Sequence, residues 1–143
     1  LRADLDGKPR PIHTWHGERT LAYERTTSWV RSNIVQQPRT VREGDGWAEK
    51  IVGEHDLLYF TLRRLEFEKR IEDDTCGKFH VLTLVDGERI RIRSVAQPER
   101  YFDAEYMDMV VVPADMGRYV IENLRTEPIS VHKTMLKDGF DKE

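Results

Sequence analysis

The chain has 143 residues, of which 34% are charged and 38% apolar, and its formal net charge at pH 7 is −3. This length suits one domain with a short appendage, and its core needs neither metal nor disulfide to fold. The mixed charges exclude a general nucleic-acid or membrane surface, so we expect no such partners. Cys76 is the only cysteine, and no signal peptide or membrane-spanning run is visible, so we expect a cytoplasmic location.

The first part of the chain, residues 1–50, is predicted to be an arm and a connecting segment. Residues 1–20 are polar and interrupted by prolines and glycines, which predicts an extended or looped arm because proline fixes φ and lacks an N–H donor. Residues 42–56 hold three glycines among many charges, which indicates turns with short strands. Since the chain starts at Leu1 without a methionine, we expect it to be a segment of a longer protein.

A clearer strand pattern begins at residue 57. Apolar residues alternate along 57–71, first from Phe60 and then from Leu65, with a slip of one residue in the phase at Arg63–Arg64. Such a slip is what a β-bulge produces in a strand. The sequence therefore predicts a bulged strand here.

Further strands follow at short intervals. Asp86-Gly87 stands between two alternating runs, which is a strong hairpin signal. Later strands are predicted within residues 106–113, 117–124 and 128–136. At least six strands with no convincing amphipathic helix between them favour an antiparallel sandwich or barrel. We place the barrel at residues 51–137 and a polar tail at 138–143.

Two of these stretches resemble the cupins. They are "GKFHVLTLVDGERIRI", residues 77–92, and "VVVPADMGRYVIENL", residues 110–124. The glycine turn and the proline-led turn fall in the order and spacing of the two cupin motifs. This resemblance covers about residues 57–137 and implies an all-β, cupin-type jelly-roll β-sandwich or barrel, preceded by the extended N-terminal arm.

The N-terminal half adds a second resemblance. "DGKPRPIHTWHGERTLAY", residues 6–23, and the stretch 36–67 resemble the C-terminal portion of type I mannose-6-phosphate isomerases. The resemblance implies a parent enzyme that interconverts mannose 6-phosphate and fructose 6-phosphate with zinc. We expect zinc in that intact enzyme and no cofactor in this segment. Sugar phosphate, the rest of the parent chain and a second copy in a homodimer are the partners that it implies.

The cupin resemblance also indicates where metal ligands would stand. Metal cupins place His-x-His-x3-Glu before the first glycine turn, and these positions fall here on Asp74, Cys76 and His80. The second-motif histidine falls near Arg118 or Tyr119, and neither replaces a neutral imidazole well. Asp74, Cys76 and His80 can chemically bind zinc, but a fourth ligand is missing. We therefore expect a barrel without metal, with Arg118 and Tyr119 as candidate binding residues at its mouth.

Arm residues could also carry chemistry. The isomerase resemblance implies that Arg10 contacts the substrate phosphate in the intact enzyme, a role that suits the planar fork of a guanidinium. The alternative is a solvated arm residue. His13 and His16 could share a metal if the backbone curls, although ordinary structural hydrogen bonds are the favoured reading.

The remaining candidates are better explained by structure than by chemistry. Arg89, Arg91 and Arg93 form a stripe on one strand face that could hold an anion, but we expect a solvated face with acidic cross-strand partners such as Glu66, Glu68 or Glu72. His132 is expected on a polar outer face. The tryptophans could stack on a sugar or pin the arm to the barrel, and pinning is favoured; they are Trp15, Trp29 and Trp47.

Three functions stay open at this point, besides the remote alternative of a small metalloenzyme that acts through Asp74, Cys76 and His80. The chain could be the C-terminal cupin of a mannose-6-phosphate isomerase, without a metal site of its own. It could instead be a non-catalytic cupin that binds a sugar or regulates a partner. It could also be a structural barrel that forms a domain or dimer interface.

Overall fold

The structure, a computed structural model, describes residues 2–139 of the chain. The chain divides into two compact units, one ending at Val35 and the other beginning at Gln36. Neither of the α-helices among the described residues has the length and hydropathy needed to cross a membrane.

The N-terminal unit contains two short helices, α1 (Thr14–Thr20) and α2 (Thr27–Asn33), and neither has a buried residue. The prediction of an extended or looped arm over residues 1–20 is therefore wrong for α1. The sequence contains no clear signal for the start of this helix, because α1 has no side-chain cap. The second helix begins at a recognisable signal: the side chain of Thr26 accepts a hydrogen bond from the backbone N–H of Trp29.

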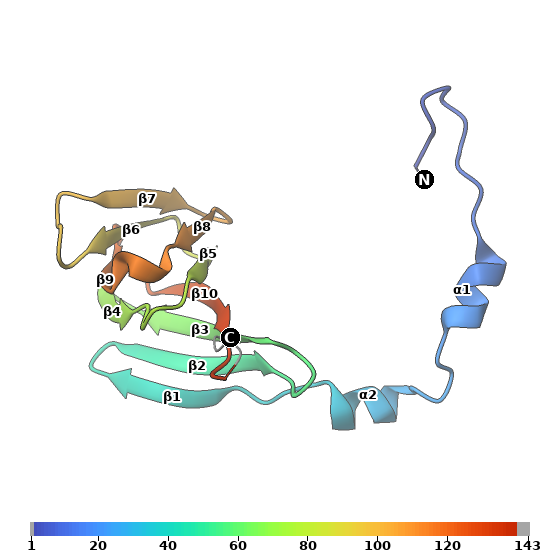
Figure 1. Cartoon of the computed structure of the whole chain (residues 1–143), viewed down its shortest axis with the longest axis horizontal. Helices are drawn as coiled ribbons and strands as arrows, with labels where there is room; N and C mark the ends of the chain where they lie inside the picture. Colours follow the sequence, from blue (N-terminus) through green and yellow to red (C-terminus); the bar gives the residue numbers. More distant parts are fainter. Residues whose placement is uncertain (1, 140–143) are drawn as a thin grey trace. The chain divides into compact units, whose positions relative to one another are not determined.

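The second unit is a two-layered β-sandwich (Figure 1). Its strands are β1 (Arg39–Gly44), β2 (Trp47–Glu54), β3 (Phe60–Phe67), β4 (Arg70–Asp74), β5 (His80–Asp86), β6 (Arg89–Ser94), β7 (Tyr101–Glu105), β8 (Met109–Val112), β9 (Arg118–Asn123) and β10 (Ile129–Leu136), with a 3₁₀ turn, η1 (Ala114–Met116), after β8. One sheet has the order β1-β2-β3-β10-β5-β8 and the other β4-β9-β6-β7. All pairings are antiparallel, which confirms the predicted jelly-roll sandwich.

The sandwich begins earlier in the chain than the sequence indicated. Strands β1 and β2 belong to the six-stranded sheet, whereas the sequence placed the barrel from residue 51 onward. Strand β1 is exposed at nearly every position. Because it is an edge strand, it lacks the apolar alternation by which strands are recognised.

The Asp86-Gly87 hairpin is confirmed by the structure. Strand β5 ends at Asp86 and β6 begins at Arg89. Gly87 has a φ of 119°, and a Cβ at this position would lie 2.5 Å from Cγ2 of Ile129. The turn therefore requires glycine for both its backbone conformation and its close packing.

The predicted bulge at Arg63–Arg64 is absent from β3, which pairs with β10 in unbroken register from residue 60 to 67. The irregularity lies in the neighbouring strand β2, between Ile51 and Gly53. The most buried side chains of β3 are those of Thr61, Leu65 and Phe67, and Arg63 shares their phase. The apparent slip arose because polar residues occupy inward positions at one end of this strand.

The interior accordingly has an apolar end and a polar end. Buried hydrophobic side chains from both sheets form one cluster: Leu65, Phe67, Ile71, Leu82, Leu84, Ile90, Ile92, Ala104, Val112, Tyr119, Ile121, Ile129 and Val131. At the polar end, Lys133 is the cross-strand neighbour of Arg63. Thr61 and His80 are the cross-strand neighbours of Met135, one on each side of β10. The side chains that could do chemistry are gathered at this polar end.

Candidate functional site

A buried ammonium group lies at the centre of the polar end. Lys133, on β10, is only 2% exposed. Its Nζ lies 2.8 Å from Oε1 of Glu49 and 2.5 Å from Oδ2 of Asp73. Glu49 belongs to β2 of the same sheet, whereas Asp73 belongs to β4 of the facing sheet. The lysine thus connects the two layers of the sandwich.

Two arginines complete the charge cluster. Arg63 Nη1 donates to Glu49 Oε1 at 3.0 Å, and Arg42 Nη2 donates to Asp73 Oδ1 at 2.9 Å. Arg42 Nε also donates to Glu49 Oε2. Two carboxylates therefore face three permanently or normally cationic groups, so the cluster carries an excess of positive charge. Charges buried this deeply persist only when they are paired and hydrogen-bonded.

A tyrosine and a histidine extend the cluster by hydrogen bonds. The hydroxyl of Tyr119 donates to Asp73 Oδ2 at 3.1 Å, and Nδ1 of His80 lies 2.7 Å from that hydroxyl oxygen. Because the phenolic proton points to Asp73, Nδ1 of His80 must carry the proton that it donates to Tyr119. Nε2 of His80 is buried and has no hydrogen-bond partner among residues 2–139.

The surroundings shift the pKa values of these groups in directions that keep the network intact at neutral pH. Burial would raise the pKa of Glu49, but Lys133 and Arg42 outweigh it and lower that pKa to about 2. Burial, aided by Lys133, lowers the pKa of His80 to about 4. Burial and Asp73 raise the pKa of Tyr119 above its ordinary value. Glu49 is therefore ionised at neutral pH, and His80 and Tyr119 are uncharged.

The structure brings together only part of the candidate set taken from the sequence. His80 and Tyr119 meet inside the sandwich. Asp74 and Cys76 are exposed, and Oδ1 of Asp74 accepts a hydrogen bond from the backbone N–H of Cys76 in the turn after β4. The inward place is taken by Asp73 instead. Within the described residues, no group of three or more His, Cys, Asp or Glu side chains could hold a metal ion.

The polar end does not fit zinc. A divalent cation needs carboxylate oxygens that are free to coordinate it, and those of Glu49 and Asp73 already accept from Lys133 and two arginines. A bound cation would also face the positive charge of these donors at close range. The chemistry of the donor set thus favours an internal ion network over a metal centre.

Arg118, the other residue expected at the barrel mouth, points the opposite way from Tyr119. It is exposed, and its Nη2 donates to Oε2 of Glu72 on the outer face at 3.0 Å. Successive residues of a strand point to opposite faces. Arg118 and Tyr119 therefore lie on different faces of β9, and their role as binding residues at the barrel mouth stays a prediction.

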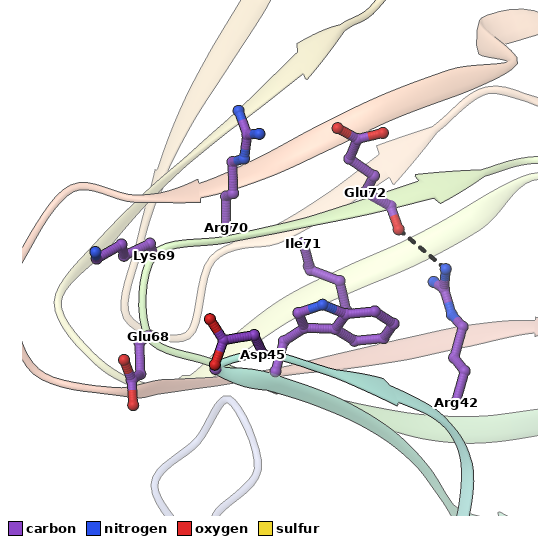
Figure 2. Close-up of a pocket in the computed structure, with 9 residues that line it drawn as sticks. Arg42, Asp45, Glu68, Lys69, Arg70, Ile71 and Glu72 are labelled. Atoms are coloured by element: carbon purple, nitrogen blue, oxygen red, sulfur yellow. Dashed lines mark hydrogen bonds between the residues drawn. The ribbon is translucent and has the colours of Figure 1, made fainter.

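A surface hollow lies next to the ion network (Figure 2). Its volume is about 610 Å³, and it is lined by Arg42, Asp45, Gly46, Trp47, Glu68, Lys69, Arg70, Ile71 and Glu72. Arg42 belongs to both places: besides its bonds to Glu49 and Asp73, its Nη1 donates to the backbone oxygen of Glu72 at 3.1 Å. We call this hollow the Arg42 groove. It offers charges of both signs beside an indole ring, a surface that suits a polar, hydroxylated ligand.

The arm candidates are engaged in local contacts. Nε of Arg10 donates to Oδ1 of Asp4 at 2.6 Å, so the proposed phosphate ligand is paired within its own unit. The rings of His13 and His16 lie edge to face, with centroids 5.5 Å apart. That is a ring contact, with no chelate formed by the two imidazoles.

The arginine stripe is a paired face, as expected, although its acidic partners differ from those named. Arg89 and Arg91 both bind Asp103, at 3.0 and 2.6 Å, and Arg93 binds Glu122. Each partner lies on an adjacent strand, β7 or β9. This stripe therefore needs no ligand to account for it.

His132 and the tryptophans also have structural roles. Nε2 of His132 accepts from Nε of Arg64 across the sheet, opposite the buried phase of β10. Trp47 packs against the hydrophobic cluster, with Cζ of Arg42 5.4 Å from its ring centroid. Trp47 is thus a residue of the sandwich itself. Trp15 and Trp29 lie in the N-terminal unit, each under an arginine of its own neighbourhood.

Sequence reasoning missed the centre of the site, although one signal could have found it. In β10, Ile129 and Val131 are buried, and Lys133 continues the same phase. A lysine in phase with two core residues must either be exposed by the end of the strand or have a buried partner. Arg63 in β3 carries the same signal, because it is in phase with the buried residues Leu65 and Phe67 of an unbroken strand.

No protein-family model matches the sequence, and a search of curated proteins finds no significant match. Solved structures do match. The mannose 6-phosphate isomerase of Bacillus subtilis superposes with a TM-score of 0.65 at 15% identity, covering 93% of this chain and 37% of that one. A cupin-2 domain protein of Rhodospirillum rubrum gives 0.55 at 13%, covering 71% and 70%. The cupin domain of Schizosaccharomyces pombe Cnp3 gives 0.52 at 15%, covering 64% and 65%.

The chain has a cupin fold. At these identities the likeness concerns architecture alone. Within this fold, strand β5 supplies His80 and strand β9 supplies Tyr119, and both belong to the hydrogen-bonded extension of the ion network.

Proposed function

We propose that this chain is a non-catalytic cupin module of a mannose-6-phosphate-isomerase-like protein. The observation that carries the non-catalytic part is the ammonium group of Lys133 held between Glu49 and Asp73. The two carboxylates accept hydrogen bonds from Lys133 and two arginines and so connect the sheets. Their oxygens are therefore not free to bind zinc or to move a substrate proton. The module would brace a catalytic unit and present the Arg42 groove to solvent.

The link to the isomerases is supported by the extent of the structural likeness. The match to the Bacillus subtilis enzyme extends over 93% of this chain, so it includes most of the N-terminal unit as well as the sandwich. The chain spans 37% of that enzyme's length. In such a protein, aldose–ketose isomerisation moves a proton between C1 and C2 of the sugar phosphate. The zinc that assists it would be held by residues of another segment.

The proposal is tested by assaying the purified chain with mannose 6-phosphate and zinc, together with elemental analysis. We expect no turnover and less than stoichiometric zinc. Turnover by the chain alone, or one tightly held zinc per chain, would overturn the non-catalytic assignment. The full-length product of the natural gene is then assayed in the same way. If it lacks isomerase activity, the proposed relation to the isomerases fails, whereas the assignment of this chain as a non-catalytic module still holds.

A second candidate function is binding of a sugar or sugar phosphate in the Arg42 groove. It is favoured by the position of Lys69 and Arg70, which line the groove and make no ion pair among the described residues. Titration calorimetry with mannose 6-phosphate is the measurement. Arg70→Ala should abolish saturable binding, whereas Arg39→Ala, on an exposed arginine whose partner Glu54 also lies outside the groove lining, should leave it unchanged. Equal affinities of both variants would exclude this groove.

A further inference from the structure

The free edges of the two sheets meet on one side of the sandwich. β7 is an edge strand of the four-stranded sheet and β8 an edge strand of the six-stranded sheet. A short turn joins them directly (Figure 1), and residues of both strands line a single cleft of about 230 Å³. We call residues 101–112, which form this side, the β7–β8 edge.

The β7–β8 edge exposes a dense group of large apolar side chains. Each is between 55 and 72% exposed: Tyr101, Phe102, Tyr106, Met107, Met109 and Val111. Strand β8, with the sequence Met-Val-Val-Val, has no charged residue and pairs on only one side, with β5. An apolar strand with unpaired backbone groups readily pairs with another chain, and natural sheets normally protect such edges.

The opposite edge of the same sheet is protected in the usual manner. Strand β1 carries Arg39, Arg42 and Glu43, and Arg39 forms an ion pair with Glu54 of β2. Charged side chains along an edge oppose strand addition. The contrast between β1 and β8 indicates that the β7–β8 edge is the side left available for pairing.

We propose that two copies of this chain associate through the β7–β8 edge, with β8 antiparallel to β8 of the second copy. A two-fold axis between Val110 and Val111 places each of these residues opposite the other in the partner copy. The contact uses the same patch on both copies, as a closed dimer requires. It joins the two six-stranded sheets into one and covers the apolar side chains of the edge.

The charges at the two ends of the edge are complementary under this symmetry. Arg100 lines the cleft beside Val112, where β8 ends, and makes no ion pair within residues 2–139. Asp108 directly precedes β8, in the turn where its carboxylate accepts a hydrogen bond from the backbone N–H of Glu105. The two-fold axis brings Asp108 of one copy to the Arg100 end of the other. This self-complementarity favours a second copy over an unrelated partner.

The test is the mass of the chain in solution, measured by light scattering and by sedimentation over a range of concentrations. The expected mass is twice the chain's 16.9 kDa. Val111→Lys places a charge on the free edge of β8 and should raise the dissociation constant at least about ten-fold. Val41→Lys is the matched control: it lies on the opposite edge strand β1, is also exposed, and should leave the dimer unchanged.

Two further variants test the interface at positions where a substitution should not disturb folding. Met109→Lys alters a side chain that is 72% exposed and so removes no core packing. It should dissociate the dimer and melt at the temperature of the unsubstituted chain diluted until it is monomeric. Asp108→Asn keeps the turn acceptor while removing the charge, and should weaken the dimer about two- to five-fold at low salt. A monomer at every concentration would overturn the proposal and leave the edge to another protein segment. A dimer that survives both lysine substitutions, or that Val41→Lys dissociates, would overturn it as well.

Discussion

Nζ of Lys133 and Oδ2 of Asp73 lie 2.5 Å apart, although the two residues belong to different sheets. The same gap is bridged by Arg42 to Asp73 and by His80 to Tyr119. At this end of the sandwich, charge and hydrogen bonding therefore hold the layers together, whereas apolar packing does so at the other end. The consequences of that division can be measured.

Replacing Lys133 by methionine should destabilise the fold by about 3 kcal/mol, because it removes a buried donor whose charged hydrogen bonds to Glu49 and Asp73 connect the two sheets. Arg42 and Arg63 remain to satisfy Glu49 and Asp73 in part, which keeps the loss below that of an isolated buried charge. The measurement is urea unfolding at pH 7.

Lys50→Met is the control for this experiment. Lys50 makes a partly exposed ion pair with Glu66, so its loss should cost at most about 1 kcal/mol. Equal losses in the two variants would contradict the importance of the internal network.

Tyr119→Phe should cost about 1–3 kcal/mol. It removes the hydroxyl that donates to Asp73 and accepts from His80, leaving a buried N–H without its partner. Tyr101→Phe, at an exposed position on β7, should be nearly neutral. If Tyr119→Phe were equally neutral in thermal and urea unfolding, the hydrogen-bonded connection between the sheets would be shown to contribute little.

Stability should fall as the pH is lowered, in two overlapping steps. His80 has a folded pKa of about 4 against 6.5 for a free histidine, so the unfolded chain takes up the proton first, and stability is lost as pH falls from 6.5 towards 4. Glu49 has a folded pKa of about 2 against 4.5, so its contribution, on the order of 3 kcal/mol, is lost between pH 4.5 and 2.

The assignment of the upper step is checked by His80→Gln, measured by urea unfolding at each half unit of pH. This variant should lose most of the pH dependence between 6.5 and 4. His132→Gln should remove a smaller part, because burial and Arg64 lower the pKa of His132 in the same direction. An unchanged slope in His80→Gln would show that another group titrates in this range.

Gly87→Ala should destabilise the chain more than Gly77→Ala. Both glycines have positive φ, at 119° and 78°, so both variants carry backbone strain of about 1–2 kcal/mol. Only at Gly87 does the new Cβ also meet a core side chain, that of Ile129, whereas nothing lies within 4 Å of it at Gly77. Thermal unfolding of both variants measures the extra cost at Gly87, which combines the contact with Ile129 and a φ further from the left-handed well. Equal melting temperatures would contradict it.

The parts of the fold that the sequence revealed are those in which local pattern and tertiary packing agree. The Asp86-Gly87 hairpin and the strands after residue 57 alternate as strands with one buried face do. Strand β1 escaped notice because an edge strand covered by charges has no such alternation. Helix α1 escaped because it is short and lacks a cap.

The candidate site was predicted only in outline. The spacing of the motifs directed attention to His80 and Tyr119, which do meet. It also suggested Asp74, whereas strand alternation turns Asp73 inward instead. Glu49 and Lys133 could not be paired from the sequence because they are 84 residues apart, the difference between 133 and 49, and their contact depends on β2 and β10 both flanking β3.

The unequal borders of the six-stranded sheet limit how the chain can assemble. Charges on β1 oppose addition of a further strand, and β8 has no such charges. When a strand can be added at only one edge of a sheet, addition stops after a single step, because the pairing occupies that edge in both copies. In the proposed dimer the uncharged edges of both copies are covered, so the assembly is a closed pair and does not continue into fibres.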